Sequence, residues 1–399
     1  MRKILTLLGC LLAALGVQAQ EAELTASELD RDKESRYEAV LTASENEIEN
    51  LWARGKKALY ALNLDIGANI SLLAQRVAPG GKQTSFQAVY NPYLSWHVLP
   101  ENDYGSGKIT LSYTLARYWG AQAVVFQPRA GLVVPVNNYE DNQENFTQFS
   151  YTHTLPGSWD WLSATVGQYP IDTFEGSQYL DDQQTGLIHY ALSQNASAIY
   201  PDSSFGAYLQ AKNEQFTVAT GYQDGQNLSG AQIRLNDAFD GKYTTFGSVM
   251  WTPQLTCGAA QYGILYYYQP SVSTRPGSGH GWSFNGQQNI GEDWAVFTRI
   301  NGSTGGLTGV KNSYVLGGAR LDPLHRNPND AIVVGLAYNR LTNDEQVARS
   351  SETVLEAQWV WGIGKLVTVT PDLQLIPQAG MRSSTRPVAV FGVRTTVML

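Results

Sequence analysis

Hydrophobic positions along the chain follow two different periods, and the change falls near residue 58. Before it, apolar side chains recur every three or four residues, at Tyr37, Val40, Leu41, Ile48, Leu51 and Trp52. This spacing predicts an amphipathic helix. We therefore expect an acidic helical segment over residues 20–57. Three arrangements of this segment fit the pattern: a helix that packs its apolar stripe against the rest of the chain, a coiled-coil stalk, or a disordered arm.

From Ala58 onward the period is two. Apolar residues alternate with polar or small ones from Tyr60 to Leu72, and again over 109–115, 353–361, 367–375 and 391–399. A dozen or more such segments of about 10 residues, with Trp and Tyr near their ends, are typical of outer-membrane barrels. Lipid cannot hydrogen-bond to the backbone, so a sheet in a bilayer has to close on itself.

The fold class that we predict is all-β, a transmembrane antiparallel β-barrel of about sixteen strands over residues 58–399. The strands are expected to centre near residues 66, 91, 113, 125, 164, 208, 219, 248, 263, 286, 296, 316, 336, 357, 371 and 394.

Met1 to Ala19 has the organisation of a cleaved signal peptide. Arg2 and Lys3 precede an apolar stretch, and Val17 to Ala19 offers small side chains for cleavage. After residue 19 no apolar run approaches the ~20 residues that a transmembrane helix needs. We therefore expect export, a barrel in the outer membrane of a Gram-negative type of cell, and a periplasmic N-terminal segment.

Composition and charge exclude several classes of function. Only 16% of the 399 residues are charged, and without the signal peptide the chain carries 25 basic and 35 acidic residues. A net charge of −10 argues against nucleic acid, whose phosphates require a basic surface. The five histidines lack metal-ligand spacing, and no nucleotide-binding or GxSxG motif occurs. We therefore predict no metal, no cofactor and no enzymatic activity.

Residues 169–203 depart most clearly from the strand rhythm. An irregular segment of this length inside a compact protein is usually functional. We expect it to be a constriction segment that folds into the barrel.

The sequence also resembles a known family, the carbohydrate-selective outer-membrane porins. The resemblance rests on Gly167-Gln168-Tyr169 with Phe174-Glu175, on YVLGGARLDP over residues 314–323, and on TPDLQLI over residues 370–376. It implies a barrel of about sixteen strands through which mono- or small oligosaccharides diffuse passively. The implied partners are carbohydrate solutes and outer-membrane lipid, in a monomer or a homotrimer. A general diffusion porin, a barrel enzyme and a polysaccharide exporter remain as alternatives.

Alternation identifies candidate channel residues, because a charge that faces lipid near the midplane costs about 2–4 kcal/mol. With apolar residues outward, five polar side chains of the last three predicted strands face the lumen: Glu352, Glu356, Asp372, Gln374 and Arg394. Further candidates are Arg320, Asp172 and Glu175, and Trp161 as a stacking surface for sugar rings. We expect these residues to contact the solute; the alternative is that the charged ones only brace the barrel wall.

Overall fold

The structure is a computed structural model that describes residues 47–78, 84–175, 177–235, 239–305, 308–342, 347–384 and 386–399. Residues 1–46, which include the predicted signal peptide and most of the predicted acidic segment, lie outside these ranges. Three α-helices are described: α3 (Glu47–Tyr60), α4 (Ala123–Ala130) and α5 (Tyr190–Ser193). None of the described helices is long and apolar enough to cross a membrane.

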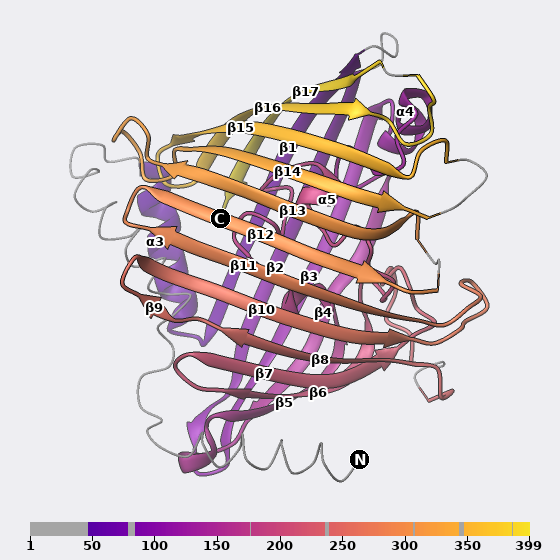
Figure 1. Ribbon diagram of the computed structural model, residues 1–399. Helices are drawn as coiled ribbons and strands as arrows, with labels where there is room; N and C mark the ends of the chain where they lie inside the picture. The colour runs from indigo at the N-terminus through magenta and orange to yellow at the C-terminus, as the bar shows by residue number, and fades with distance from the viewer. Residues whose placement is uncertain are drawn as a thin grey trace.

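Sixteen long antiparallel strands form one closed sheet (Figure 1). In chain order they are β1 (Leu64–Ala78), β2 (Thr84–Asn102), β3 (Gly105–Gly120), β4 (Gln143–Thr154), β5 (Leu162–Tyr169), β6 (Ser204–Lys212), β7 (Phe216–Asp224), β8 (Tyr243–Trp251), β10 (Gly258–Gln269), β11 (Gly279–Ile290), β12 (Trp294–Ser303), β13 (Val310–Leu321), β14 (Ala331–Leu341), β15 (Ser351–Ile363), β16 (Val367–Gln378) and β17 (Val388–Met398). The two-residue β9 (Gln254–Leu255) only extends the connection between β8 and β10.

Pairing of the first strand with the last closes the barrel. Strand β1 pairs with β2 on one side and with β17 on the other, from Asn69 opposite Met398 to Ala78 opposite Ala389. The described strands therefore present no open sheet edge to lipid, where unpaired backbone groups would be costly. The prediction of a closed barrel of sixteen strands is confirmed.

Alternation along each strand separates the two faces of the wall. On β14, Ile332, Val334, Leu336 and Tyr338 are exposed on the outer surface, whereas the residues between them are buried inside. The outward side chains contact lipid, and the inward ones contact the contents of the barrel.

One predicted strand is wrong, and one real strand was missed. The apolar run at residue 125 forms the helix α4, because a short apolar run can be a strand or a buried helical turn. Strand β4 was missed because its register shifts opposite Ser112 and Tyr113. As a result Phe146 and Phe149 both face outward although they are three residues apart, which breaks the period of two.

The two ends of the barrel differ in the length of their connections. At one end, residues 103–104, 213–215 and 364–366 form short turns; at the other, residues 121–142, 170–203 and 225–242 form long loops. Helix α3 lies at the short-turn end (Figure 1), where the Lys365 N–H donates to Glu49 over 2.7 Å. The helix continues to Tyr60, past the predicted end at residue 57, and Leu51 of its apolar stripe is 71% exposed.

Candidate functional site

The polar side chains predicted on the last three strands point into the barrel, but they do not face open lumen. Glu352 and Glu356 are fully buried and Arg394 is 1% exposed. Two long connections cover them. We call residues 170–203, between β5 and β6, the inner loop, and residues 121–142, between β3 and β4, the α4 loop.

Glu352 of β15 holds the α4 loop. Its carboxylate accepts from the backbone N–H groups of Val133 at 3.0 Å and Val134 at 2.9 Å. The Gly380 N–H, just after β16, donates to the same carboxylate over 2.7 Å. A charged acceptor thus pairs three backbone donors that would otherwise be buried without partners.

Glu356 and Arg394 hold the inner loop through opposite kinds of backbone group. Glu356 accepts from the N–H groups of Ile188 at 2.6 Å and His189 at 2.9 Å. The Arg394 guanidinium donates to the carbonyl of Gly186 at 2.7 Å and to that of Gln183. The carboxylate thus pairs backbone donors of the loop, and the guanidinium pairs backbone acceptors.

Asp372 and Gln374 of β16 belong to the same buried network. The Gln374 amide donates to Asp372 at 3.2 Å and to the Val136 carbonyl in the α4 loop at 3.0 Å. The expectation that Glu352, Glu356, Asp372, Gln374 and Arg394 contact solute is therefore corrected. Glu352, Glu356, Gln374 and Arg394 bind backbone of the two loops, and Asp372 is buried beside the Gln374 amide. Alternation in the sequence indicates the inward direction but not what lies inside.

Two further arginines hold the inner loop, and sequence reasoning missed both. Arg299 of β12 donates to Asn285 at 2.8 Å and to the Leu180 carbonyl, and Arg275 donates to the Ile199 carbonyl at 2.5 Å. Arg299 could have been found, because it shares the inward parity of Ala295 and Phe297 on its strand.

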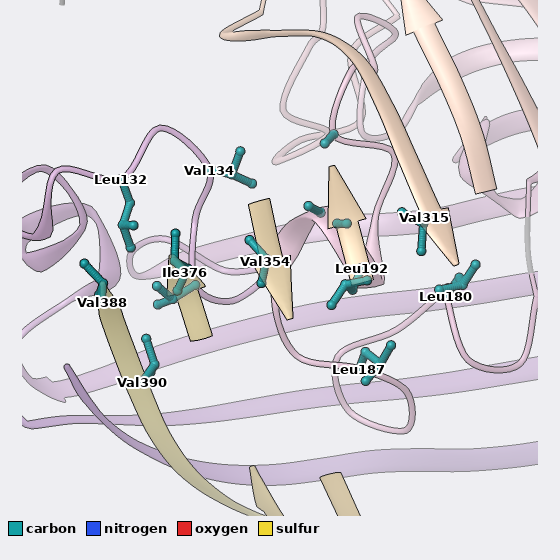
Figure 2. Packing of buried hydrophobic residues seen from close by; sticks show 14 of the residues in the cluster. Leu132, Val134, Leu180, Leu187, Leu192, Val315, Val354, Ile376, Val388 and Val390 are labelled. Atoms are coloured by element: carbon teal, nitrogen blue, oxygen red, sulfur yellow. The ribbon is translucent and has the colours of Figure 1, made fainter. Parts of the chain in front are cut away.

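Apolar packing fills the space beneath these hydrogen bonds. Leu180, Leu187 and Leu192 of the inner loop, with Leu132 and Val134 of the α4 loop, belong to one buried cluster with wall residues Val315, Val354, Ile376, Val388 and Val390 (Figure 2). Next to the two loops, the barrel half along β13–β17 is thus a packed core.

Arg320 does not line the lumen. It shares the outward face of β13 with the exposed Tyr314 and Leu316, and it forms an ion pair with Asp293 at 2.8 Å. Its guanidinium also lies 5.1 Å from the ring centroid of Trp294. The prediction of a lumen role is wrong because Arg320 sits at the short-turn rim, where a charged head reaches polar surroundings and leaves the lipid face.

Trp161 is likewise distant from the inner loop. It precedes β5, whereas Asp172 follows the opposite end of that strand, so about eight residues or ~27 Å of strand separate them. Its ring stacks on Trp159, and its indole N–H donates to the Ser158 carbonyl over 3.1 Å. Trp161 therefore belongs to the short-turn rim and not to a sugar-stacking surface at the inner loop.

Asp172 and Glu175 both lie in the inner loop but differ in their surroundings. Glu175 is buried and accepts from Asn195 at 2.8 Å and from the Tyr200 hydroxyl at 3.0 Å, so it braces the loop internally. Asp172 is half-buried. Burial, together with the carboxylates of Asp181, Glu175 and Asp202, raises the pKa of Asp172 to about 8.

The opposite half of the barrel is open. Inward-facing hydroxyl and amide side chains of β2–β4 are only half-buried there: Ser95, Thr110, Ser112, Gln148 and Thr152. A separate cavity of about 1020 Å³ lies below the inner loop, towards the short-turn end. It is bounded by Tyr179 and Thr185 of the inner loop, by the turns at Cys257 and Glu292, and by wall residues of β13–β17 such as Val333, Val360 and Thr368. Among the described residues no cluster of three side chains could hold a metal ion.

A sixteen-stranded membrane barrel whose interior is narrowed by loops tied to its own wall is the architecture of a porin. The chain matches the carbohydrate-selective porin family, the OprB family, over residues 126–399 and belongs to that family. The family and the fold are those of a channel in the outer membrane.

Relatives and solved structures agree with this assignment. A porin named AaxA from Chlamydia pneumoniae is 35% identical over 352 residues, which cover 85% of this chain and 80% of that protein. Porin AaxA from Chlamydia abortus is 36% identical over 317 residues, 78% of this chain and 70% of that protein. The high-pH structure of Pseudomonas putida OprB shares the fold, with a TM-score of 0.71 at 15% identity over 87% of this chain and 97% of that one.

Replacing Glu356 with Ala should release the inner loop from the wall. Two buried N–H groups then lose their acceptor, at a cost of about 1–3 kcal/mol each. We expect a larger and noisier single-channel conductance, and cleavage within residues 170–203 by chymotrypsin. The control is Glu214→Ala, an equal loss of charge at an exposed turn. Unchanged conductance together with full protease resistance in Glu356→Ala would contradict a holding role.

The charge of Asp172 should make ion selectivity depend on pH. As pH rises through about 8, Asp172 loses its proton and adds a negative charge to the lumen. One charge about 7 Å away in water attracts K⁺ and repels Cl⁻ by about 0.6 kcal/mol each, so the K⁺/Cl⁻ permeability ratio should rise by up to about sevenfold. Reversal potentials at pH 7 and pH 9 measure this rise, because Asp181 and Asp202, whose pKa values burial raises to about 6, are already mostly ionised at pH 7. It should vanish in Asp172→Asn and persist in Asp160→Asn, which lies in an exposed turn at the other end of β5.

Proposed function

We propose that the chain mediates passive diffusion of mono- and small oligosaccharides across the outer membrane, through the open half of the barrel. The observation that carries this proposal is the inward face of β2–β4, where hydroxyl and amide side chains are half-buried. Neutral hydrogen-bonding groups can replace the hydration water of a sugar at little net free energy, about 0.5–1.5 kcal/mol for each bond. A lining of this chemistry favours polyhydroxylated solutes over ions.

Within this proposal, the inner loop narrows the route. Its backbone is fixed on the packed side by Glu356, Arg394 and Arg299. Its other side carries Asp172, Asp181 and Asp202, which are half-buried or exposed. A solute thus passes between these carboxylates and the hydroxyl-lined wall. The residues that we assign to selectivity are Asp172 on the loop and Thr110, Ser112 and Gln148 on the wall.

A bulky side chain in the open half should obstruct sugar flux. Ser112 faces inward on β3, so Ser112→Trp places an indole in the proposed route. In proteoliposome swelling with arabinose, glucose and maltose, we expect the rates for the variant to fall severalfold, most steeply for maltose. Thr298→Trp, on the outward face of β12, adds the same side chain towards lipid and should keep wild-type rates.

Two results would count against the proposal. If Ser112→Trp keeps the swelling rates of the wild type, solute does not pass along β3. If sugars, amino acids and salts of one size permeate the wild-type channel equally fast, the protein is instead a general diffusion porin.

We also propose an orientation: the long loops face outward from the cell, and the short turns and α3 face the periplasm. The support is the contrast between turns such as 213–215 and loops such as 170–203, because outer-membrane barrels carry short periplasmic turns and longer external loops. The contact of Glu49 with Lys365 ties α3 to the short-turn end.

Cys257 provides a test of this orientation. It is exposed in the turn before β10, at the short-turn end. A 5-kDa maleimide polymer, too large for the pore, should leave Cys257 unlabelled in intact cells and label it after the outer membrane is permeabilised. Labelling of intact cells would reverse the orientation, and Cys257→Ser controls for the specificity of the reagent.

A further inference from the structure

A second cavity lies at the short-turn end, where α3 meets the first strands. It has a volume of about 340 Å³. Inward-facing Asp65 of β1, Ser95 of β2 and Lys108 of β3 line it, and Tyr60 at the end of α3 closes one side. It lies on the open half of the barrel, on the same inward face as Thr110.

Strand pairing brings these polar groups together. Asp65 is paired with Ser95, and Ser95 is paired with Thr110 on the next strand. Lys108 precedes Thr110 by two residues on β3 and therefore points to the same face. Adjacent strands lie about 4.8 Å apart, so the three lining side chains span a width comparable to a sugar ring.

The junction between helix and strand fixes the outer side of the cavity. Asn63 adopts a left-handed conformation with φ of 61°, and its carbonyl accepts from the His97 N–H at 2.9 Å. The Tyr60 hydroxyl donates to Asp65 at 3.3 Å, and Lys56 lies 3.9 Å from the same carboxylate. Helix α3 thus orients Asp65 from two positions.

Lys108 is the group in the cavity whose hydrogen-bonding capacity is not used. Within the described ranges, its ammonium has no hydrogen-bond or ion-pair partner, although the residue is half-buried. An ammonium carries three donors, and leaving them unpaired in a partly enclosed site is unfavourable unless water or a ligand accepts them. Asp65 and the Ser95 hydroxyl supply acceptors beside it.

We propose that this cavity is a second sugar-binding subsite, at the short-turn exit of the channel, which holds one monosaccharide unit. This inference rests on the proposed function and extends it. The volume falls within the ~300–1,000 Å³ of small-molecule sites. Lys108 donates to sugar hydroxyl oxygens and Asp65 accepts from sugar hydroxyl groups. Tyr93, two residues before Ser95 on the same face, lies next to the cavity, with its ring packed on Gly67.

The subsite also gives α3 a function. The helix supplies Tyr60 as a wall and Lys56 and Tyr60 as partners that hold Asp65 in place. Solute that leaves the region of the inner loop meets a second group of donors before it reaches open water, so binding energy is divided between two sites along the path. Division of this kind favours conduction, because neither site has to bind so tightly that release becomes slow.

The test is block of single-channel ion current by glucose, added to one side of a planar bilayer at a time. Lys108→Met should raise the dissociation constant for glucose added on the short-turn side by about tenfold, equivalent to about 1.4 kcal/mol. Block by glucose from the long-loop side should change by less than twofold. Lys108→Gln, which keeps a donor, should give an intermediate constant.

Lys212→Met is the matched control. Lys212 ends β6 at the same end of the barrel, so this variant makes the same change of charge outside the cavity and should behave as wild type. If Lys108→Met has the same dissociation constants for glucose as the wild type on both sides, the subsite is overturned and the proposed function stays intact. Absence of glucose block in the wild-type channel would overturn both.

Discussion

The arrangement of this barrel depends on hydrogen bonds between charged wall side chains and the backbone of its two inward loops. Irregular backbone inside a membrane barrel exposes N–H and C=O groups with no ladder partner, and each buried unpaired group is costly. Charged side chains pair both kinds of group. Glu352 and Glu356 of the wall accept from N–H groups, while Arg299 and Arg394 of the wall donate to carbonyls, as does Arg275 of the loop between β10 and β11. Because charged partners give stronger hydrogen bonds than neutral ones, a few side chains suffice to fix long segments.

An off-centre channel follows from this arrangement. The anchors lie mainly on β12–β17, so the loops and their leucines fill that side of the barrel. Towards the long-loop end, the loops also cover inward positions of β2–β4, such as Gln87, Val89 and Thr114. Towards the short-turn end, small polar side chains of the same strands, such as Ser95, Thr110 and Ser112, are only half-buried. The smaller cavity at α3 lies on this uncovered part of β1–β3, whereas the larger cavity below the inner loop borders β13–β17.

Sequence periodicity predicts the wall well, because outward residues must match lipid on every strand. It gave fifteen of the sixteen strand positions, and failed at β4, where a register shift breaks the period, and at α4, whose apolar run fits either structure. The contents of the barrel are harder to predict, since a buried anchor and a lumen-lining residue share the same inward parity. Glu356 and Thr110 therefore look alike in the sequence, although one is buried under a loop and the other faces the open half. Arg320 shows a different error: it lies in the family motif at residues 314–323, but its parity with Tyr314 and Leu316 places it on the outward face.

The choice of arginine at three anchor positions has a consequence for the electric field in the channel. A guanidinium is planar and presents several donors in fixed directions, so Arg394 bonds two carbonyls of the inner loop through Nη1 while Nη2 donates to the Thr370 hydroxyl of the wall. The Nη1 donors point to backbone on the packed side of the loop. The Asp181 and Asp202 carboxylates of the inner loop are exposed, and the positive charges of Arg299 and Arg275 act on them. The arginines that hold the loop backbone therefore also offset part of the negative charge that the loop exposes, which limits the net field that it adds to the channel.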